Sequence, residues 1–423
     1  MKPLAVFFGA LGALLAAIAL TWHKPTVVDH RDDATELALL RDMALDAQNQ
    51  ECSPQANPRL NFARPRPPLF FEADHQVEHL VFEGGGARAL SYLGALQTLE
   101  DLPHSTFLLD KIHSVAGSSA GSVIALGTAV GCKPHSLLNT IRVHFRRLQR
   151  EDFDWSFPES VVRWPRRVYS MINHGSVNDG DTLMQVTQDI VRCGGLPANA
   201  TFGDLYQQRG ITLVVTATEL STLKVRYFSP TTSPDVALAD AVVASQSIPF
   251  VFAPKRIGRQ LYIDGGIGHQ FPLALFDGSI ESHTIEDRRT HPSTLGFLLV
   301  DSDVEVVDFD STQVTLKPKE PPAHLPSDST WMGASDVLGQ LVNLWQGSLE
   351  NMQAQALYPS AEALWRRTLV MEAGEYESFD FALDDDKLNA IVQLGARSVL
   401  AQLQDTSVSS ARCRDRLNPK NGR

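Results

Sequence analysis

From residue 77 onwards, short apolar runs of strand type alternate with longer stretches in which apolar residues recur at helical spacing. The pattern predicts strands at 77–83, 111–116, 211–216, 225–229, 261–263, 294–300 and 368–371. It predicts helices at 87–101, 120–131, 236–245, 332–357 and 387–403. Because a strand, a helix and a second strand in succession usually form a parallel unit, this alternation predicts an α/β fold with a mainly parallel central sheet.

The start of the chain has a different pattern. Residues 3–22 form an uncharged, mostly apolar run with a lysine on each side. At about 1.5 Å per residue, a helix of this length crosses a bilayer, and Trp22 would lie at its interface. Residues 1–24 are therefore predicted to be a membrane anchor. Two alternatives remain: a signal peptide cleaved after the small-x-small motif at 17–19, which would leave a secreted protein, and a buried soluble helix.

Composition divides the rest of the chain into five parts. Residues 25–76 are polar and contain prolines, which indicates a tether, and 77–300 should form the main domain. Residues 301–330 are acidic and Pro-rich without helical or strand period, so we expect a surface insertion there. The elements within 331–406 should complete the domain, and 407–423 is a basic tail.

Charge and cysteine content exclude some classes of function. The chain of 423 residues has a net charge of −12, which argues against electrostatic binding of nucleic acid. Its length suffices for a large core, so stability requires neither a metal nor a disulfide. The cysteines lack the spacing of a zinc module and stand at Cys52, Cys132, Cys193 and Cys413. In an exported protein they could pair in three ways, and the sequence does not choose between these pairings and free thiols.

Three glycine-containing segments carry candidate chemistry. The first, 117–121, reads Gly-Ser-Ser-Ala-Gly and fits the pattern G-x-S-x-G at the junction of a predicted strand and helix. A serine on such a sharp turn exposes its hydroxyl at a helix N-terminus, where developing negative charge is stabilised. Ser119 is therefore the candidate nucleophile, and Gly117 and Gly121 permit close packing. The alternative is an ordinary turn with an N-capping serine.

The second segment consists of Gly84, Gly85 and Gly86, followed by Ala87 and Arg88. Consecutive glycines between a strand and a helix let backbone N–H groups point into a cavity and bind an oxyanion. The alternatives are a phosphate-binding loop and a merely tight turn. The segment lacks the endings and spacings of nucleotide-binding loops, which argues against a nucleotide. Arg88 could hold the loop in shape or be a surface charge.

The third segment, Asp264-Gly265-Gly266, follows a predicted strand. In most proteins Asp-Gly-Gly is only a turn. Acyl transfer, however, requires a nucleophile, a base and an oxyanion site, and the three segments supply one of each from the ends of strands. The combination predicts an acyl-transfer site with Asp264 as the base.

In this order, the segments resemble the patatin-like phospholipase family, and the resemblance extends from Val77 to Pro272. It also includes the sequences at 92–96, 216–218, 244–249, Phe252 and Pro254. The resemblance implies a three-layer α/β/α sandwich with a mainly parallel central sheet. It also implies hydrolysis of glycerolipid acyl esters at a membrane, without a metal or another cofactor. Phe379-Asp380 and Gly395-Ala396 are similar to the C-terminal segments of bacterial-type members.

The resemblance further implies a Ser–Asp dyad. Ser119 would attack the ester carbonyl, Asp264 would take up its proton and pass it to the leaving alcohol, and water would release the fatty acid. An ordinary carboxylate is a weak base, so the dyad requires a water-poor pocket that raises the pKa of Asp264. The N–H groups of Gly85 and Gly86 would be the oxyanion donors. The whole oxyanion hole would comprise Gly84, Gly85, Gly86 and Arg88. The turns would be supported by Gly117, Gly121, Gly265 and Gly266.

Two positions depart from the family pattern: Ala89, where many members have glycine, and Gln270, where many have asparagine. Since neither supplies the nucleophile or the base, we expect altered packing rather than lost activity. Three alternatives stay open: a non-catalytic lipid-binding or scaffolding protein, a transacylase, and an α/β-hydrolase triad. The triad would use one of the histidines His269, His283 and His291.

Two charged clusters complete the sequence-based predictions. Basic and aromatic residues between 146 and 167 could dock the chain on an anionic bilayer or form a solvated helix face beside a small core. The set comprises Arg146, Arg147, Arg150, Phe153, Trp155, Phe157, Arg163, Trp164, Arg166 and Arg167. The acidic run 384–386 lacks the spacing of a calcium loop, and it predicts a charge cluster at the N-terminus of a helix.

Overall fold

The computed structural model describes residues 76–101, 109–148, 176–178, 180–277, 293–300, 304–310, 313–318, 366–372, 376 and 383–403. The chain divides into two compact units, Met1–Asp32 and Asp33–Arg423, and all of the described residues belong to the second. The predicted anchor and the basic tail lie outside the described residues, as does all but the last residue of the tether. Among the helices that are described, none has the length and apolar composition needed to cross a membrane.

The second unit is built on a mixed, mostly parallel sheet. Its parallel strands are, in spatial order, β12 (Thr368–Glu372), β9 (Thr294–Val300), β1 (His79–Phe82), β2 (Ser114–Gly117) and β4 (Thr212–Glu219). Its antiparallel strands are β5 (Lys224–Phe228) and β8 (Gln260–Ile263), which both pair with β4, and β7 (Lys255–Ile257), which pairs with β8. Two short strands pair separately, namely β3 (Ser176–Asn178) and β6 (Phe250–Phe252). Because β1 and β2 are parallel neighbours, the segments that follow them begin at the same edge of the sheet.

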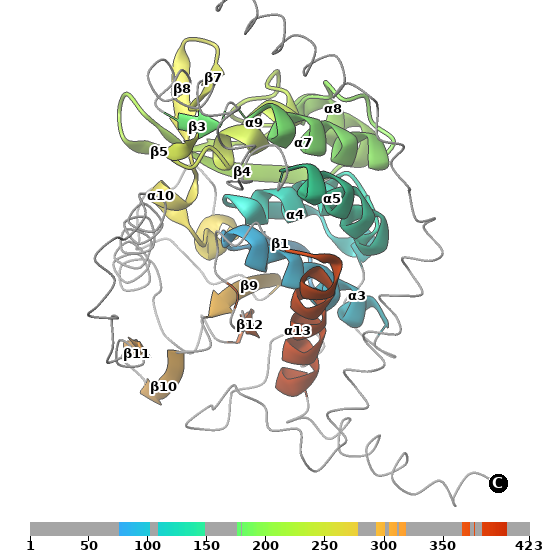
Figure 1. Ribbon diagram of the computed structural model, residues 1–423, viewed down its shortest axis with the longest axis vertical. Helices are drawn as coiled ribbons and strands as arrows, with labels where there is room; N and C mark the ends of the chain where they lie inside the picture. Colours follow the sequence, from blue (N-terminus) through green and yellow to red (C-terminus); the bar gives the residue numbers. More distant parts are fainter. Residues whose placement is uncertain are drawn as a thin grey trace, which may run out of the picture. The chain divides into compact units, whose positions relative to one another are not determined.

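Helices pack on one face of this sheet. They are α3 (Ser91–Asp101), α4 (Ala120–Ala129), α5 (Pro134–Leu148), α7 (Asp181–Cys193), α8 (Phe202–Arg209), α9 (Leu238–Ser245) and α13 (Asp385–Leu403), and Figure 1 shows them beside the strands. Alternate strand residues face opposite sides of a sheet. In β1, Leu80 and Phe82 therefore join the large apolar core under the helices. Val81 faces the other side and packs with Phe271 and Leu273.

The opposite face is covered by a short segment that comes directly after the Asp-Gly-Gly turn. This segment contains α10 (Gly266–His269) and the 3₁₀ turn η5 (Leu273–Phe276). Its apolar side chains pack on Val214 of β4 and Val370 of β12. The described residues thus form an α/β fold whose mixed, mostly parallel sheet is flanked by helices.

Most of the predicted elements are present. All seven predicted strands are found, with ends that differ by a few residues. The predicted helix at 87–101 is divided into the 3₁₀ turn η2 (Gly86–Leu90) and α3. Helices α5, α7 and α8 have no counterpart among the predicted elements, because polar residues repeatedly interrupt their apolar positions; α7, for example, buries only one face. The predicted helix at 332–357 lies outside the described residues.

The expectation of an irregular insertion at 301–330 is wrong for part of this range. The strands β10 (Val304–Asp310) and β11 (Gln313–Pro318) pair as an antiparallel hairpin. In β10, apolar and acidic residues alternate in two short runs, Val304-Glu305-Val306 and Val307-Asp308-Phe309-Asp310. This alternation is a strand pattern of period two, which the acidic composition of the segment obscures.

One of the disulfide pairings left open by the sequence is present. Cys132, which follows α4, is bonded to Cys193, the last residue of α7, with the two Cα atoms 5.4 Å apart. Cys52 and Cys413 lie outside the described residues. The bond links the segment between α4 and α5 to the end of α7, and these helices pack on the same face of the sheet.

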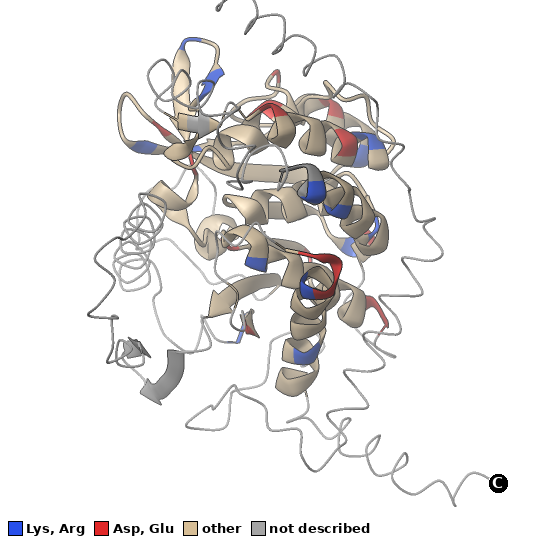
Figure 2. Ribbon diagram, viewed as in Figure 1, with Lys and Arg blue, Asp and Glu red and all other residues tan. Residues whose placement is uncertain are grey.

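Ion pairs connect α5 to the first residue of α13. Arg142 and Arg146 both contact Asp385, and Figure 2 shows acidic residues at this end of α13. The carboxylate of Asp384 accepts a hydrogen bond from the N–H of Lys387 at 2.9 Å, so the predicted charge cluster at a helix N-terminus is confirmed. Arg146, from the proposed membrane-docking set, thus pairs with another helix. The side chains of the other members of that set lie outside the described part.

Candidate active site

Ser119 lies between the end of β2 and the start of α4. Its backbone has φ 48° and ψ −128°, a combination that is strained for a residue with a side chain. The Ser119 N–H donates to Oγ of Ser245 at 2.8 Å. The N–H and the hydroxyl of Ser122 both donate to the carbonyl oxygen of Ser119, at 2.9 and 2.6 Å. These bonds hold the strained turn in place, with Ser119 only 5% exposed.

Glycines on either side of Ser119 permit an approach that a side chain would block. A Cβ atom on Gly121 would overlap the carbonyl oxygens of Phe82 and Glu83 at the end of β1. A Cβ atom on Gly117 would overlap the carbonyl oxygen of Gly121. Helix α4 therefore packs directly against the end of β1, which brings Ser119 next to the glycine segment that follows β1.

Asp264 follows β8 and lies beside Ser119. The Ser119 hydroxyl donates to Oδ2 of Asp264 at 2.7 Å, across 145 positions of sequence. The N–H of Gly266 donates to Oδ1 at 2.8 Å, and the Thr218 hydroxyl donates to the carbonyl oxygen of Asp264 at 3.0 Å. The carboxylate is thus oriented by the turn that carries it, and one oxygen is directed at the serine.

The burial of Asp264 changes its acidity. The residue is 2% exposed, and this burial raises the pKa of its carboxyl to about 7, whereas hydrogen bonds from Ser119 and Gly266 lower it. An ordinary aspartate has a pKa of about 4 and holds a proton only weakly. A carboxyl with a pKa near neutrality can accept a proton and release it again during a reaction at that pH.

The C-terminal end of α9 holds both residues of the pair. Ser245 accepts the N–H of Ser119 through its hydroxyl, and its carbonyl oxygen accepts the N–H of Gly265 at 3.0 Å. The carbonyl oxygen of Ser247 accepts the N–H of Asp264 at 2.9 Å. The sequence-based site did not include these two serines. Both lie in the Ala-Ser-Gln-Ser-Ile-Pro segment that supports the family resemblance, and that segment is the signal that would have found them.

Gly84 lies against both Ser119 and Gln270. A Cβ atom on Gly84 would be 2.9 Å from Cβ of Ser119. The N–H of Gly84 donates to the carbonyl oxygen of Gln270 at 3.2 Å, and Nε2 of Gln270 donates to the carbonyl oxygen of Gly84 at 2.7 Å. Gln270, one of the two departures from the family pattern, therefore clamps the glycine segment to the loop that follows Asp264.

The next residues of the glycine segment begin η2. Gly86 has φ 57°, in the region that favours glycine. The backbone N–H and Nε of Arg88 donate to the carbonyl oxygen of Gly85 at 3.2 and 3.5 Å. Within the described ranges the N–H of Gly85 has no acceptor, whereas that of Gly84 is already bonded to Gln270. The segment thus keeps a backbone donor available at the residue after Gly84, which itself lies against Ser119. Arg88 helps to fix the shape of the segment.

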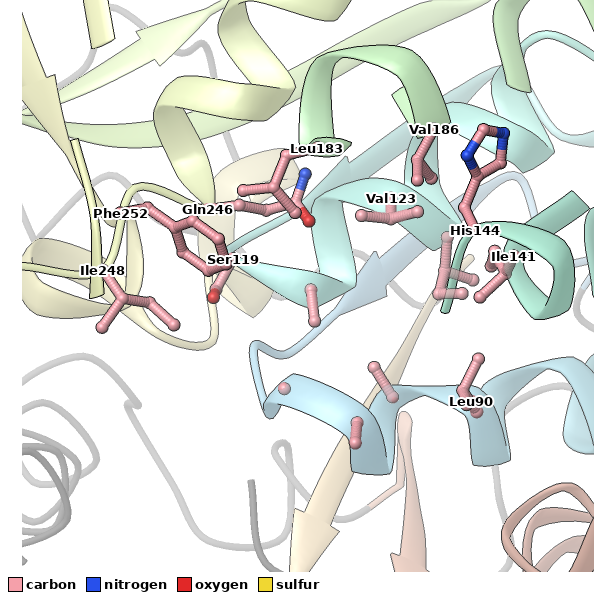
Figure 3. Close-up of a pocket in the computed structure, with 15 residues that line it drawn as sticks. Leu90, Ser119, Val123, Ile141, His144, Leu183, Val186, Gln246, Ile248 and Phe252 are labelled. Carbon is pink, nitrogen blue, oxygen red and sulfur yellow. The ribbon is translucent and has the colours of Figure 1, made fainter. Parts of the chain in front are cut away.

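An apolar pocket extends from Ser119 between the helices. Its walls include Leu90, Val123, Ile141, Leu183, Val186 and Phe252, and Figure 3 shows their side chains around the cavity. Gly86 and Ala87 from the glycine segment also line it. Small-molecule sites of this kind combine apolar walls with a few placed polar groups. The pocket therefore offers an apolar ligand a binding place that touches the serine hydroxyl.

The arrangement gives less support to a catalytic triad with a histidine and to a metal site. His269, a candidate base for a triad, is buried and its Nδ1 lies 2.8 Å from the hydroxyl of Tyr227. Because the Ser119 hydroxyl donates directly to Asp264, His269 does not stand between them as a triad requires. His283 and His291 lie outside the described residues. Over the described ranges, no group of three His, Cys, Asp or Glu side chains is placed to hold a metal ion.

Comparisons with known proteins show which family part of the chain resembles. Residues 80–277 match the family model described as Patatin-like phospholipase. The probable lipid hydrolase 463L of Invertebrate iridescent virus 6 is 24% identical over 212 residues, which are 50% of this chain and 66% of that protein. The triacylglycerol lipase ptl3 of Schizosaccharomyces pombe is 29% identical over 212 residues, 46% of this chain and 41% of the lipase. The chain thus covers less than two thirds of the length of these relatives.

Solved structures show more distant similarity. VipD from Legionella pneumophila matches with a TM-score of 0.40 and 14% identity, over 85% of this chain and 73% of VipD. The ExoU–SpcU complex from Pseudomonas aeruginosa contains a chain that matches with a TM-score of 0.33 and 18% identity, over 80% of this chain and 52% of that one.

Proposed function

Because the chain belongs, through residues 80–277, to the patatin-like phospholipase family, we propose that it is a lipid acyl hydrolase of phospholipase A type. It cleaves acyl esters of glycerolipids with Ser119 as the nucleophile and Asp264 as the base. The observation that carries this proposal is the 2.7 Å hydrogen bond between these two side chains at the wall of an apolar pocket. The glycerolipid is the substrate, and the reaction uses no cofactor.

The first half of the reaction forms an acyl-enzyme. Oγ of Ser119 attacks the ester carbonyl carbon while its proton passes to Oδ2 of Asp264. The negative charge that develops on the carbonyl oxygen is stabilised by the backbone N–H groups of Gly85 and Gly86 and by the N-terminal end of α4. When the tetrahedral intermediate collapses, the ester C–O bond breaks and Asp264 returns the proton to the leaving alcohol.

The second half releases the fatty acid. A water molecule gives a proton to Asp264 and attacks the acyl carbon, and the bond to Oγ of Ser119 then breaks. The proton passes from Asp264 to Oγ, which restores the serine. The acyl chain occupies the apolar pocket throughout, so the carbonyl carbon stays beside the nucleophile.

Hydrolysis of phospholipid and triacylglycerol esters by the full chain tests the proposal. Ser119→Ala should abolish fatty acid release, whereas Ser118→Ala, at the adjacent buried serine, should keep most of it. Acyl transfer to an added acceptor alcohol in preference to water would support the transacylase alternative. A chain that binds lipid but releases no fatty acid would support the non-catalytic alternative.

The proposal includes a location for the protein at a membrane. Residues 1–24 anchor the domain to a membrane, and cleavage of a signal peptide with secretion is the alternative. The disulfide between Cys132 and Cys193 favours an oxidising compartment in both cases, because disulfides persist there. The N-terminal sequence of the mature protein decides: a start at Met1 in the membrane fraction supports the anchor, and a start after Ala19 in the soluble fraction supports cleavage.

We also propose that the complete domain is a three-layer α/β/α sandwich assembled from residues 77–300 and 331–406. The helices on one face and the segment of α10 and η5 on the other support this arrangement. Limited proteolysis should remove 25–76 first and leave these two ranges in one protease-resistant fragment.

A further inference from the structure

At the side of the pocket remote from Ser119 lies a polar residue, His144 of α5. Ile141, one helical turn earlier, lines the pocket beside it, which places both residues on the face of α5 that borders the cavity. Figure 3 shows Val123 and Val186 between Ser119 and His144. His144 is 9% exposed, so its ring belongs to the interior of the protein.

One ring nitrogen of His144 is fixed by a neighbouring helix. Its Nε2 lies 2.7 Å from Oδ2 of Asp189 on α7. A carboxylate only accepts hydrogen bonds, so Nε2 carries the hydrogen in this pair whether the ring is neutral or protonated. Asp189 also pairs with Arg192 in the same helix. The carboxylate is therefore held from two sides, and it fixes the orientation of the imidazole ring.

The other nitrogen, Nδ1, is buried and has no hydrogen-bond partner within the described part of the chain. Figure 3 shows one ring nitrogen of His144 directed toward Val186, which also lines the pocket. Buried polar atoms are normally hydrogen-bonded, and leaving one without a partner is unfavourable. Since His144 and Val186 both line the pocket, a polar group on a ligand that enters beside Val186 is placed to supply the missing partner.

We infer that this pocket selects fatty acyl chains that carry a hydroxyl group, and that Nδ1 of His144 binds this hydroxyl. The inference rests on the proposed acyl hydrolase function and adds the class of acyl chain. In a neutral ring, Nδ1 accepts a hydrogen bond from the hydroxyl; in a protonated ring, it donates one to the hydroxyl oxygen. A hydroxyl group satisfies both forms of the ring, whereas a keto group satisfies only the protonated one.

The place of the hydroxyl along the acyl chain follows from the place of His144. Ser119 holds the ester carbon, and Val123 stands four residues further along α4, a rise of about 6 Å. His144 lies beyond Val123 as seen from Ser119. A hydroxyl next to the ester carbonyl therefore stays beside Ser119, whereas a hydroxyl in the middle of the chain reaches His144.

A series of esters with one alcohol and octadecanoyl chains tests the inference. The chains are unsubstituted or carry a single hydroxyl group moved carbon by carbon along the chain, and kcat/KM is measured with the full-length protein. We expect one mid-chain position to be hydrolysed about tenfold faster than the neighbouring positions, as one net hydrogen bond provides. A hydroxyl near the carbonyl should give no such advantage.

Variants assign the preference to His144. His144→Leu puts an apolar side chain in the wall and should remove the preference, so that the mid-chain hydroxy ester and the unsubstituted ester have about equal kcat/KM. His144→Gln retains a hydrogen-bonding group and should restore part of the preference. Ile141→Leu, one turn away in the same wall, is the matched control and should keep it. A thermal unfolding midpoint for each variant separates lost selectivity from lost folding.

Equal kcat/KM for all hydroxyl positions in the wild type, or a preference that survives in a folded His144→Leu, would overturn the inference and leave the proposed hydrolase function intact. If no ester is hydrolysed, the proposed function fails instead. Binding of hydroxyoctadecanoate and octadecanoate to Ser119→Ala then decides the inference separately. Tighter binding of the mid-chain hydroxy acid supports it, and equal binding overturns it.

Discussion

The carboxyl group of Asp264, the proposed base, carries a cost in stability. Its burial raises its pKa to about 7, so the folded chain keeps a proton that the unfolded chain, with a pKa of about 4 at this group, has already lost. Between these two values the folded state binds more protons than the unfolded state, and the free energy of unfolding falls as the pH rises. The carboxyl group that we propose as the base for Ser119 therefore weakens the fold at neutral pH.

The pH dependence of the reaction should reveal the ionisation of the Asp264 carboxyl group. Asp264 must be ionised to take the proton of Ser119, so kcat/KM should rise with pH and level off above a pKa of about 7. The measurement is a pH–rate profile with a soluble ester, together with a check that the protein stays folded at each pH. A plateau that extends down to about pH 5 would show that Asp264 does not act as the base at its raised pKa.

Replacing Asp264, the proposed base, should lower the activity but raise the stability of the fold. Asp264→Asn removes the buried ionisable group, so the variant should lose about a thousandfold or more in kcat. It should be more stable than the wild type at about pH 8, by up to about 4 kcal/mol, and about equally stable at about pH 4. Urea unfolding at both pH values measures the difference. A wild type that is the more stable protein at the higher pH would contradict the assigned shift.

At the scale of elements, the sequence predicts the glycine-rich turns better than the contacts between them. The pattern at 117–121 and the following apolar helix indicate the strand-to-helix turn that places Ser119. The clamp between Gln270 and Gly84 has no such local signal, because it joins residues 186 positions apart. The hairpin of β10 and β11 is the reverse case, because a local signal was present and was missed. Its sequence has a strand period, but its acidic residues suggested an irregular loop.

The clamp on the glycine segment should matter more for turnover than for binding. Gln270→Ala leaves the carbonyl oxygen of Gly84 without its 2.7 Å donor, which should cost about 1–3 kcal/mol of stability. Because the loop that carries the proposed oxyanion donors loosens, kcat should fall about 10- to 100-fold. KM should change little, since the pocket walls are untouched.

The matched control for this prediction is Gln97→Ala. Gln97 is also buried, and its amide donates to Asp101 in α3. This variant should lose stability but keep the kcat of its folded fraction. Equal kcat values for the two variants would mean that Gln270 only contributes to packing.

At the scale of the whole molecule, the site depends on strand order, which the sequence alone does not determine. Segments after β1, β2 and β8 meet because β1 lies beside β2, and β4 lies between β2 and β8. The sequence predicted these strands and the residues that follow them. It could not predict the neighbours of each strand or the disulfide pairing, since both depend on contacts between distant parts of the chain.

The disulfide should make a measurable contribution to the stability of the whole domain. Cys132 and Cys193 are 61 positions apart, and closing a loop of this length stabilises a fold by about 4 kcal/mol in the chain-entropy model. The double variant Cys132→Ala/Cys193→Ala should therefore unfold at a lower urea concentration than the wild type. A reductant should lower the wild-type midpoint toward that of the variant. If the midpoints already coincide without reductant, the bond does not stabilise the domain.

Labelling with a fluorophosphonate, followed by mass spectrometry of the peptides, tests most directly whether Ser119 is the activated nucleophile. We expect a single adduct on Ser119 in the wild type and in Ser118→Ala, much slower labelling of Asp264→Asn, and no adduct in Ser119→Ala. An adduct on a different residue, or undiminished labelling of Ser119→Ala, would contradict this expectation.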